Sequence, residues 1–259
     1  MGQPQRVIIS TGIISRSLGY LMLRRLIIGL LAVLFFFNSC TKHQTTVKAP
    51  FQKATSSFLF VLSEITFQTC EDMICIPGSS SAVGSGFLIA TNGTDSFGVT
   101  AGHVCEADPD QKIVERKMHV SLYNGISYDA EPLAVYSDQD VCILRIHGLV
   151  KGGLSMGSPP VRGEVVYTAS APFGINDVQM VPLFDGYYAG RRVSRQLDAY
   201  TIPSAPGSSG APIVNKSGGL VGMTILKYYK FENLCLSPPY EFLKDIVNGV
   251  KNDVRKRNL

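Results

Sequence analysis

From Ser57 onward, the chain is a series of short apolar stretches separated by turn residues, and no helical period connects them. Strands at such spacing indicate an antiparallel sandwich or barrel. A Gly- and Pro-rich link at residues 151–160 divides the series into two halves, 57–150 and 151–259. The predicted strands are 58–67, 83–90, 97–100, 117–123, 128–136 and 141–146 in the first half, and 164–171, 178–183, 187–193, 197–202, 211–214 and 220–226 in the second.

Only the C-terminus has a helical pattern. After two prolines at 238 and 239, the apolar residues Phe242, Ile246 and Val250 recur every four residues. We predict a helix there and interpret the basic segment 255–257 as its solvated end.

The first 40 residues have the pattern of an export signal. Arg24 and Arg25 precede a run of twelve apolar residues at 26–37. A helix that spans a bilayer needs about 20 such residues, whereas a basic flank and a short apolar run are typical of a secretory signal. Translation from Met22 would give a leader of ordinary length.

Cys40 ends this leader in the sequence Phe37-Asn-Ser-Cys40. This sequence resembles the signal of bacterial lipoproteins, in which the cysteine is lipidated and becomes the mature N-terminus. Ser39 fits that signal, whereas Phe37 stands where the pattern prefers leucine. An uncleaved anchor and plain secretion are the alternatives, and each of the three places the domain outside the cytosol. We interpret the polar residues 41–56 as a tether between the leader and the domain.

The formal net charge of +4 comes from the leader. Residues 1–39 contain four of the 24 basic residues and no acidic residue, so the rest of the chain has 20 basic and 20 acidic side chains. A nucleic-acid-binding domain would keep a basic excess. We therefore predict no nucleic-acid partner.

The cysteine spacing matches no zinc pattern. Cys70 and Cys75 are close enough in the chain for a local bridge in an oxidising compartment. Cys142 alternates into the predicted barrel core, and we interpret it as a packing residue, while Cys105 is either paired or free. Without Cys40 the number of cysteines is odd, so at least one thiol is free or pairs outside the chain.

The stretch 205–214, Ala-Pro-Gly-Ser-Ser-Gly-Ala-Pro-Ile-Val, brackets a serine pair with two glycines. Gly207 and Gly210 permit backbone angles that other residues avoid, so the chain can turn sharply there. Such a turn can expose a serine hydroxyl and aim successive N–H groups into one concavity that holds an oxyanion. A plain surface turn between strands is the alternative, and the choice depends on whether the chain also supplies a base and an acid.

His103 is the candidate base. Of the four histidines, His43 lies in the tether, His119 within a predicted strand and His147 at a strand end. His103 instead follows a strand that ends in small residues, which leave room around an imidazole.

A catalytic histidine needs a carboxylate that fixes its tautomer, and Asp138 and Asp140 are the candidates. Asp140 directly precedes the apolar stretch 141–144, which holds its backbone rigid, whereas Asp138 lies in the turn. We therefore prefer Asp140. With Ser209, the chain order becomes His, Asp, Ser, which is not the order of the α/β-hydrolase nucleophile elbow.

Four motifs in this order resemble those of trypsin/chymotrypsin-like serine proteases. They are Gly84-Ser-Gly-Phe-Leu-Ile89, Val99-Thr-Ala-Gly-His103, Asp140-Val-Cys-Ile-Leu144 and Pro206-Gly-Ser-Ser-Gly-Ala-Pro212. The resemblance implies an all-β, chymotrypsin-like fold of two six-stranded antiparallel β-barrels with a C-terminal helix.

The resemblance also implies the roles at the site. His103 would act as general base and then as general acid, Asp140 would orient it, and Ser209 would attack the scissile carbonyl. The N–H groups of Gly207 and Ser209 would form the oxyanion hole. Ser208 is excluded as the nucleophile, because Pro206, which has no N–H, would then stand where the motif has glycine. We predict no cofactor and no metal, and we interpret the acidic residues after the histidine motif as a solvated turn rather than a calcium loop.

Ser208 is also a departure from the digestive members of the family. Those members carry an aspartate at this place, which pairs with a newly cut N-terminus on activation. We therefore expect a site that needs no activating cleavage.

The specificity pocket of the family falls on five uncharged positions of this chain. Its floor would lie near Pro203 and Ser204, and its wall at Met223, Thr224 and Ile225. The absence of charge at these positions favours a small or apolar residue before the cleaved bond.

We therefore predict an exported, membrane-tethered serine endopeptidase that acts on protein or peptide substrates. One alternative is a catalytically silent member of the same fold that binds peptides or partners as a lipoprotein. Another is an unrelated β-rich structural module. Reaction with a serine-directed phosphonate separates the first hypothesis from the other two.

Overall fold

The computed structural model describes residues 49–71, 74–108, 110–228 and 231–257. The predicted leader, its Cys40 and the first part of the tether lie outside these residues. Within the described ranges, no helix combines the length and the apolar character that a membrane crossing requires.

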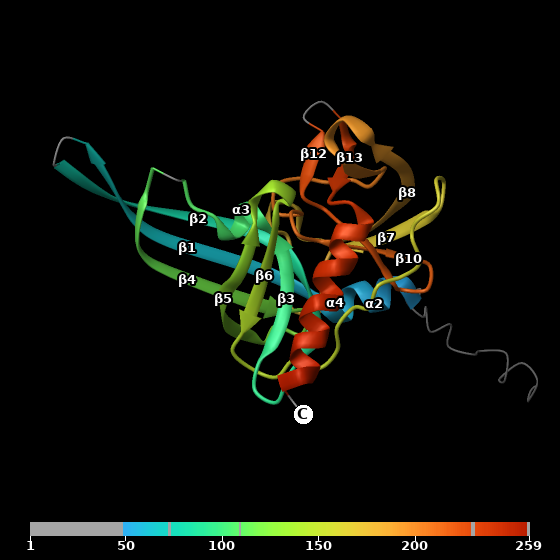
Figure 1. The fold of residues 1–259 in the computed structure, drawn as a ribbon, viewed down its shortest axis with the longest axis horizontal. Coiled ribbons are helices and arrows are strands. Elements are labelled where there is room, and N and C mark those ends of the chain that lie inside the picture. The colour runs from blue at the N-terminus through green and yellow to red at the C-terminus, as the bar shows by residue number, and fades with distance from the viewer. Residues whose placement is uncertain (1–48, 72–73, 109, 229–230, 258–259) are drawn as a thin grey trace, which may run out of the picture. The chain divides into compact units, whose positions relative to one another are not determined.

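The first half is a closed antiparallel barrel of six strands in the order β1-β2-β3-β6-β5-β4 (Figure 1). The strands are β1 (Phe58–Glu71), β2 (Ile74–Thr91), β3 (Ser96–Ala101), β4 (Lys112–Leu122), β5 (Ser127–Tyr136) and β6 (Val141–Ile146). All six predicted strands of this half are present.

β1 and β2 are longer than predicted and project from the barrel as a hairpin (Figure 1). Their pairing runs without a register shift from Phe58 opposite Phe87 to Glu71 opposite Ile74. The added part of β2 contains proline, glycine and three serines, which gave no apolar alternation to read. Cross-strand pairing stabilises this segment, and the Cys70–Cys75 disulfide joins the strands near their ends.

The second half is a half-barrel of seven described strands in the order β11-β10-β7-β8-β9-β13-β12. The strands are β7 (Val165–Ala169), β8 (Leu183–Arg192), β9 (Leu197–Tyr200), β10 (Pro212–Asn215), β11 (Leu220–Met223), β12 (Leu226–Tyr228) and β13 (Phe231–Ser237). β8 covers Leu183 and most of the predicted strand 187–193, whereas residues 178–182 of the predicted strand 178–183 are not in a strand. β13 was missed, and β12 begins only at the last residue of the predicted strand 220–226. The predicted chymotrypsin-like fold class is confirmed, with one strand more in the second half.

Three helices and three 3₁₀ turns complete the described chain. They are α2 (Ala49–Ser57), α3 (Gly102–Cys105), η1 (Ser137–Gln139), η2 (Pro172–Gly174), η3 (Val193–Arg195) and α4 (Tyr240–Arg257). α2 covers all of the described part of the predicted tether, residues 49–56. Its Ala54 is fully buried in the core, and the ring of Phe51 packs edge-on against Tyr167, so these residues belong to the folded domain.

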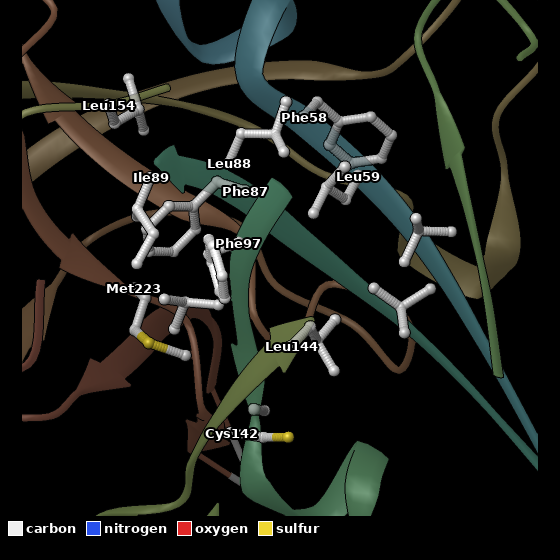
Figure 2. Packing of buried hydrophobic residues seen from close by; sticks show 14 of the residues in the cluster. Phe58, Leu59, Phe87, Leu88, Ile89, Phe97, Cys142, Leu144, Leu154 and Met223 are labelled. Atoms are coloured by element: carbon white, nitrogen blue, oxygen red, sulfur yellow. The ribbon is translucent and has the colours of Figure 1, made fainter. Parts of the chain in front are cut away.

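One hydrophobic cluster connects the two halves. Phe87 and Leu144 from the first barrel and Met223 from the second half pack in it (Figure 2). Leu243 and Val247 of the predicted C-terminal helix α4 are fully buried in the same cluster. The last helix therefore returns to cover the first barrel, which fixes the two halves against each other.

Two disulfides join four of the five cysteines in the described residues. The predicted Cys70–Cys75 bridge is present. The interpretation of Cys142 as a packing residue alone is wrong, because Cys142 is buried and also bonded to Cys105. Cys235 is a buried free thiol, in agreement with the odd number of cysteines.

A buried carboxylate anchors α4 to the second half. Asp198 of β9 is fully buried and accepts hydrogen bonds from Arg191 Nε at 2.9 Å and the Tyr188 hydroxyl at 3.0 Å. It also accepts the backbone N–H of Tyr240, the first residue of α4, at 2.8 Å. A negative charge at this end complements the helix dipole.

We expect the free energy of unfolding of the Asp198→Ala variant to be about 1–3 kcal/mol lower, because the Tyr188 hydroxyl, the Tyr240 N–H and the Arg191 guanidinium lose their acceptor. Denaturant unfolding followed by circular dichroism measures the difference. Asp185→Ala, which truncates an exposed aspartate on the neighbouring strand, is the control and should change the unfolding free energy by less than about 0.5 kcal/mol. Equal stability of the two variants would contradict the anchoring role.

Candidate active site

His103 and Asp140 meet because their strands are neighbours. β3 and β6 pair antiparallel, with Ala101 opposite Val141, so the end of β3 and the start of β6 lie at the same edge of the barrel. His103 follows β3 in the short helix α3, and Asp140 directly precedes β6.

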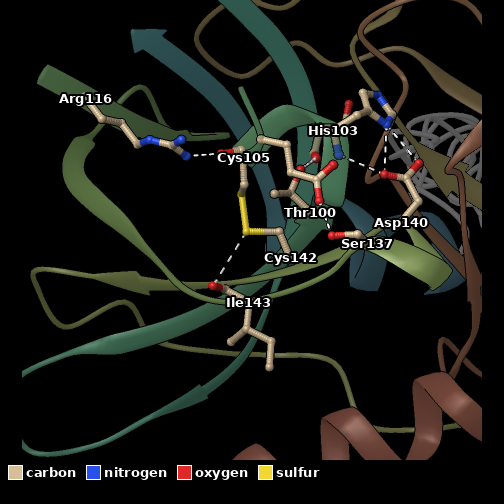
Figure 3. The surroundings of a disulfide bond; sticks show 10 residues. Thr100, His103, Cys105, Arg116, Ser137, Asp140, Cys142 and Ile143 are labelled. Carbon is tan, nitrogen blue, oxygen red and sulfur yellow. Dashed lines mark hydrogen bonds and ion pairs between the residues drawn. A yellow bond between two sulfur atoms is a disulfide. The ribbon is translucent and has the colours of Figure 1, made fainter. Parts of the chain in front are cut away.

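The His103 Nδ1 atom lies 2.8 Å from Asp140 Oδ2 and 3.0 Å from Oδ1 (Figure 3). The backbone N–H of His103 donates to Oδ1 at 2.8 Å, so both carboxylate oxygens are oriented. The hydrogen bond to Asp140 raises the pKa of His103 above 6.5; burial opposes the rise, and the charges of Asp140 and Glu106 add to it. The imidazole itself is about half exposed, with 49% of the side chain accessible to solvent.

Glycine at position 102 leaves room for the close approach of the two residues. A Cβ atom there would lie 3.0 Å from Asp140 Oδ1 and 3.1 Å from its backbone. Asp138, the alternative acid, is exposed in η1, so the structure brings Asp140 and not Asp138 to the imidazole.

A second histidine makes a similar contact in a different setting. His119 Nδ1 lies 2.8 Å from Asp129 Oδ1, but these two residues are opposite each other on the paired strands β4 and β5. This contact is a cross-strand pair on the surface. A short distance between a histidine Nδ1 and a carboxylate therefore does not by itself identify a catalytic base.

The predicted nucleophile turn depends on both of its glycines. Gly207 has φ +93° and Gly210 has φ +90°, in the left-handed region that side chains disfavour. A Cβ on Gly207 would lie 2.4 Å from the carbonyl oxygen of Ala171, and one on Gly210 would lie 2.0 Å from that of Ser85. The turn is therefore pressed against η2 on one side and β2 on the other.

Ser85 holds this turn against the barrel edge that carries His103. Its backbone N–H donates to the carbonyl oxygen of Ser209 at 2.7 Å, and its hydroxyl donates to that of Gly207 at 2.8 Å. The Thr100 hydroxyl, three residues before His103, donates to the Ser85 carbonyl at 2.7 Å. Ser85 was not predicted as a site residue, although it lies in the first of the four motifs.

Gly84 also lies between the two parts of the site. A Cβ atom at this position would contact Val104, the neighbour of His103, at 2.7 Å and the Ser209 carbonyl oxygen at 3.1 Å. The backbone of Ser209 and the helix of His103 thus meet on either side of one glycine.

Two N–H groups of the turn have no acceptor among the described residues. The N–H groups of Ser208, Gly210 and Ala211 donate to backbone carbonyls, whereas no hydrogen bond of the described chain uses those of Gly207 or Ser209. The carbonyl of Pro206 accepts from Phe173 N–H at 2.5 Å. Because a trans peptide directs its N–H away from its C=O, this contact orients the Gly207 N–H away from η2.

A cavity of about 150 Å³ lies beside the turn. Its lining residues are Pro172, Phe173, Phe184, Pro203, Ser204, Ala205 and Asn233. The predicted floor residues Pro203 and Ser204 are among them, whereas Phe173, Phe184 and Asn233 were not predicted.

The predicted wall residues do not line this cavity. Met223 and Ile225 are buried in the hydrophobic core. Thr224 is also buried, and its carbonyl oxygen accepts the Gly210 N–H at 2.6 Å. These residues therefore support the turn from behind.

Comparisons with known proteins agree on one family. Residues 84–223 match the trypsin-like peptidase domain. A "Probable periplasmic serine endoprotease DegP-like" of Pseudomonas putida is 25% identical over 67% of this chain and 36% of its own length. "Protease Do-like 1, chloroplastic" of Arabidopsis thaliana is 25% identical over 69% of this chain and 40% of its own length.

A solved structure shares the fold. The crystal structure of the serine endoprotease from Yersinia pestis superposes with a TM-score of 0.59 at 16% identity, over 80% of this chain and 68% of that one. The chain thus covers most of that structure but little more than a third of the two curated relatives.

Proposed function

Because the chain belongs to the family of trypsin-like peptidase domains, we propose that it is a serine endopeptidase with the triad His103, Asp140 and Ser209. The observation that carries the proposal is the 2.8 Å contact between His103 Nδ1 and Asp140 Oδ2, at the barrel edge where Ser85 holds the glycine turn of Ser209. The names of the relatives, which describe serine endoproteases, support the same reaction.

In the proposed reaction, Asp140 accepts the Nδ1–H of His103, which leaves Nε2 free to act as a base. Nε2 takes the proton of the Ser209 hydroxyl as Oγ attacks the carbonyl carbon of the scissile peptide bond. The oxyanion that forms accepts hydrogen bonds from the N–H groups of Gly207 and Ser209, the two donors of the turn that no described residue accepts.

After this attack, His103 acts as a general acid. It gives the proton taken from Ser209 to the leaving amine, and the C–N bond breaks to leave an acyl ester on Ser209. Water then attacks the ester carbon while His103 accepts a proton from the water. His103 returns this proton to Ser209 Oγ as the C–O bond breaks, which releases the carboxylic acid product.

The site is proposed to need no activating cleavage. Ser208, which replaces the acidic neighbour of digestive enzymes, is buried and its hydroxyl accepts the Ala205 N–H at 3.3 Å. The contact between Phe173 N–H and the Pro206 carbonyl already orients the oxyanion-hole peptide.

We further propose that the residue before the cleaved bond is small or apolar. The cavity beside the turn has aromatic walls in Phe173 and Phe184 and no charged lining residue. Cleavage of an unfolded protein, followed by mass spectrometry of the new termini, tests both the endopeptidase activity and this preference. Cleavage sites inside the substrate chain support the proposal; an intact substrate after long incubation would favour the catalytically silent alternative.

The activity should fall on the acidic side with a midpoint above pH 6.5. Only neutral His103 can accept the serine proton, and its hydrogen bond to Asp140 raises its pKa above 6.5. At pH 5.5, kcat/KM should therefore be less than about one tenth of its plateau. His119→Asn, which removes the cross-strand contact with Asp129, is the control and should keep the same midpoint. A wild-type midpoint below pH 6 in protein that is still folded would contradict the assignment of His103.

Export and membrane tethering complete the proposal. Two disulfides within the domain favour an oxidising compartment, and the Pseudomonas relative is named as periplasmic. Lipidation of Cys40 would attach the domain to a membrane. A Cys40→Ser variant should then lose processing and membrane association in cell fractionation, and a variant that is still processed and bound would argue against lipidation.

A further inference from the structure

The Cys105–Cys142 disulfide occupies matching positions on the two segments that carry His103 and Asp140. Each cysteine lies two residues after the proposed catalytic residue. The bond therefore joins the last residue of α3 to the second residue of β6 (Figure 3). We propose that this disulfide is the positioning element that holds His103 and Asp140 in catalytic geometry, an inference that rests on the proposed function.

Neither segment is held firmly by its own local structure. α3 has only four residues, and Ala101 at its start makes no capping side-chain hydrogen bond. Helices this short are not stable by themselves. Asp140 has φ 53°, a left-handed conformation that aspartate adopts more readily than most residues but less readily than glycine. The contact between the two side chains thus needs support from outside these segments.

Two polar contacts give part of that support, and both include an exposed or half-exposed side chain. The Arg116 guanidinium donates to the carbonyl oxygen of Cys105, at the end of α3 (Figure 3). The Ser137 hydroxyl donates to the Glu106 carboxylate, which links η1 to the residue after α3. Water competes with exposed contacts of this kind, so they restrain the segments weakly.

The disulfide differs from these contacts because it is covalent and shielded from solvent. Cys105 is 1% exposed and Cys142 is 0% exposed, within the core cluster of the first barrel. The bond fixes the distance between α3 and β6 two residues away from His103 on one segment and from Asp140 on the other. By contrast, the exposed Cys70–Cys75 bridge joins two strands of the hairpin and touches neither segment.

Removal of the bond should affect the chemical step more than substrate binding. β3 and β6 remain paired along their whole length, so the barrel and the cavity beside Ser209 can persist. α3 gains freedom relative to Asp140, and a displacement of about 1 Å at a catalytic group can cost on the order of 100-fold in rate. We therefore expect kcat to fall about 10- to 100-fold with little change in KM. The acid midpoint of kcat/KM should also move down toward 6.5, because His103 loses part of its contact with Asp140.

The test compares Cys105→Ala/Cys142→Ala with the matched control Cys70→Ala/Cys75→Ala. Rates are expressed per active site, counted by titration with a serine-directed phosphonate, at a temperature below the unfolding transition of each protein. Lower kcat, similar KM and a lower acid midpoint in the first variant alone support the proposal. If Cys105→Ala/Cys142→Ala does not fold, Cys105→Ala/Cys142→Val restores part of the lost volume in the core and is measured in the same way.

Unchanged kcat and acid midpoint in a folded variant without the bond would overturn the proposal. A loss of rate that is equal in the hairpin variant would overturn it as well. Both results require an active wild-type enzyme, so they differ from a failure of the proposed function, in which the wild type itself cleaves nothing.

Discussion

Ser209→Ala is expected to lower kcat by about 10⁴- to 10⁶-fold, the range seen when a triad nucleophile is removed. The variant keeps the oxyanion-hole donors and the cavity beside the turn, so substrate binding should change little. The carbonyls of Gly207 and Ser209 still accept from Ser85, and the turn should keep its conformation. Steady-state cleavage of a peptide identified from the mapped cleavage sites measures the loss.

Ser208→Ala is the matched control, because it removes the neighbouring hydroxyl from the same turn. Ser208 is 2% exposed, and its hydroxyl only accepts the Ala205 N–H. Its removal should reduce activity less than about tenfold, since a single neutral hydrogen bond contributes about 1 kcal/mol. If Ser209→Ala retained the wild-type rate, or if Ser208→Ala lost as much, the assignment of the nucleophile would be wrong.

Asp140→Asn is expected to lower kcat by about 10⁴-fold, through the tautomer of His103. The backbone N–H of His103 donates to Oδ1 at 2.8 Å, so the amide oxygen of asparagine should take this place. The amide NH₂ would then face His103 Nδ1, which lies 2.8 Å from the Oδ2 position. Nδ1 must accept this hydrogen bond, the ring proton moves to Nε2, and the base can no longer take the serine proton.

Asp138→Asn provides the control, because it changes an exposed aspartate in the adjacent 3₁₀ turn. It should leave kcat within about twofold of the wild-type value, as most surface substitutions do. Equal effects of the two substitutions would contradict the role of Asp140.

The local sequence was sufficient to locate the six strands of the first half and the candidate base, acid and nucleophile in their chain order, whereas the barrel itself was implied by the family resemblance. Strands with a clear apolar signal, such as the continuous apolar run of β6, were located well, and Asp140 was preferred over Asp138 because it precedes this strand. Apolar patterning did not predict strands that are stabilised mainly by pairing with a neighbouring strand. The polar half of β2 pairs with β1 and is joined to it by Cys70–Cys75, and neither interaction leaves a mark in local periodicity.

The supporting parts of the site were harder to predict, because they come from distant segments. Ser85 contacts the nucleophile turn across more than 120 positions of sequence, and the cavity takes Phe184 and Asn233 from separate strands. The bond between Cys105 and Cys142 depends on the pairing of β3 with β6, which a reading of spacing alone could not establish. Met223, Thr224 and Ile225, which the family resemblance placed in the wall of the pocket, are buried instead. Their burial depends on contacts with distant segments, which the local sequence does not show.

The central claim is that Ser209 is a nucleophile activated by His103, and covalent labelling tests it most directly. The wild-type protein is incubated with a serine-directed phosphonate, digested and mapped by mass spectrometry. A single phosphonylated residue at Ser209, absent from the Ser209→Ala and His103→Ala proteins, is the predicted result. Equal labelling of wild type and Ser209→Ala, or modification at another residue, would contradict the account.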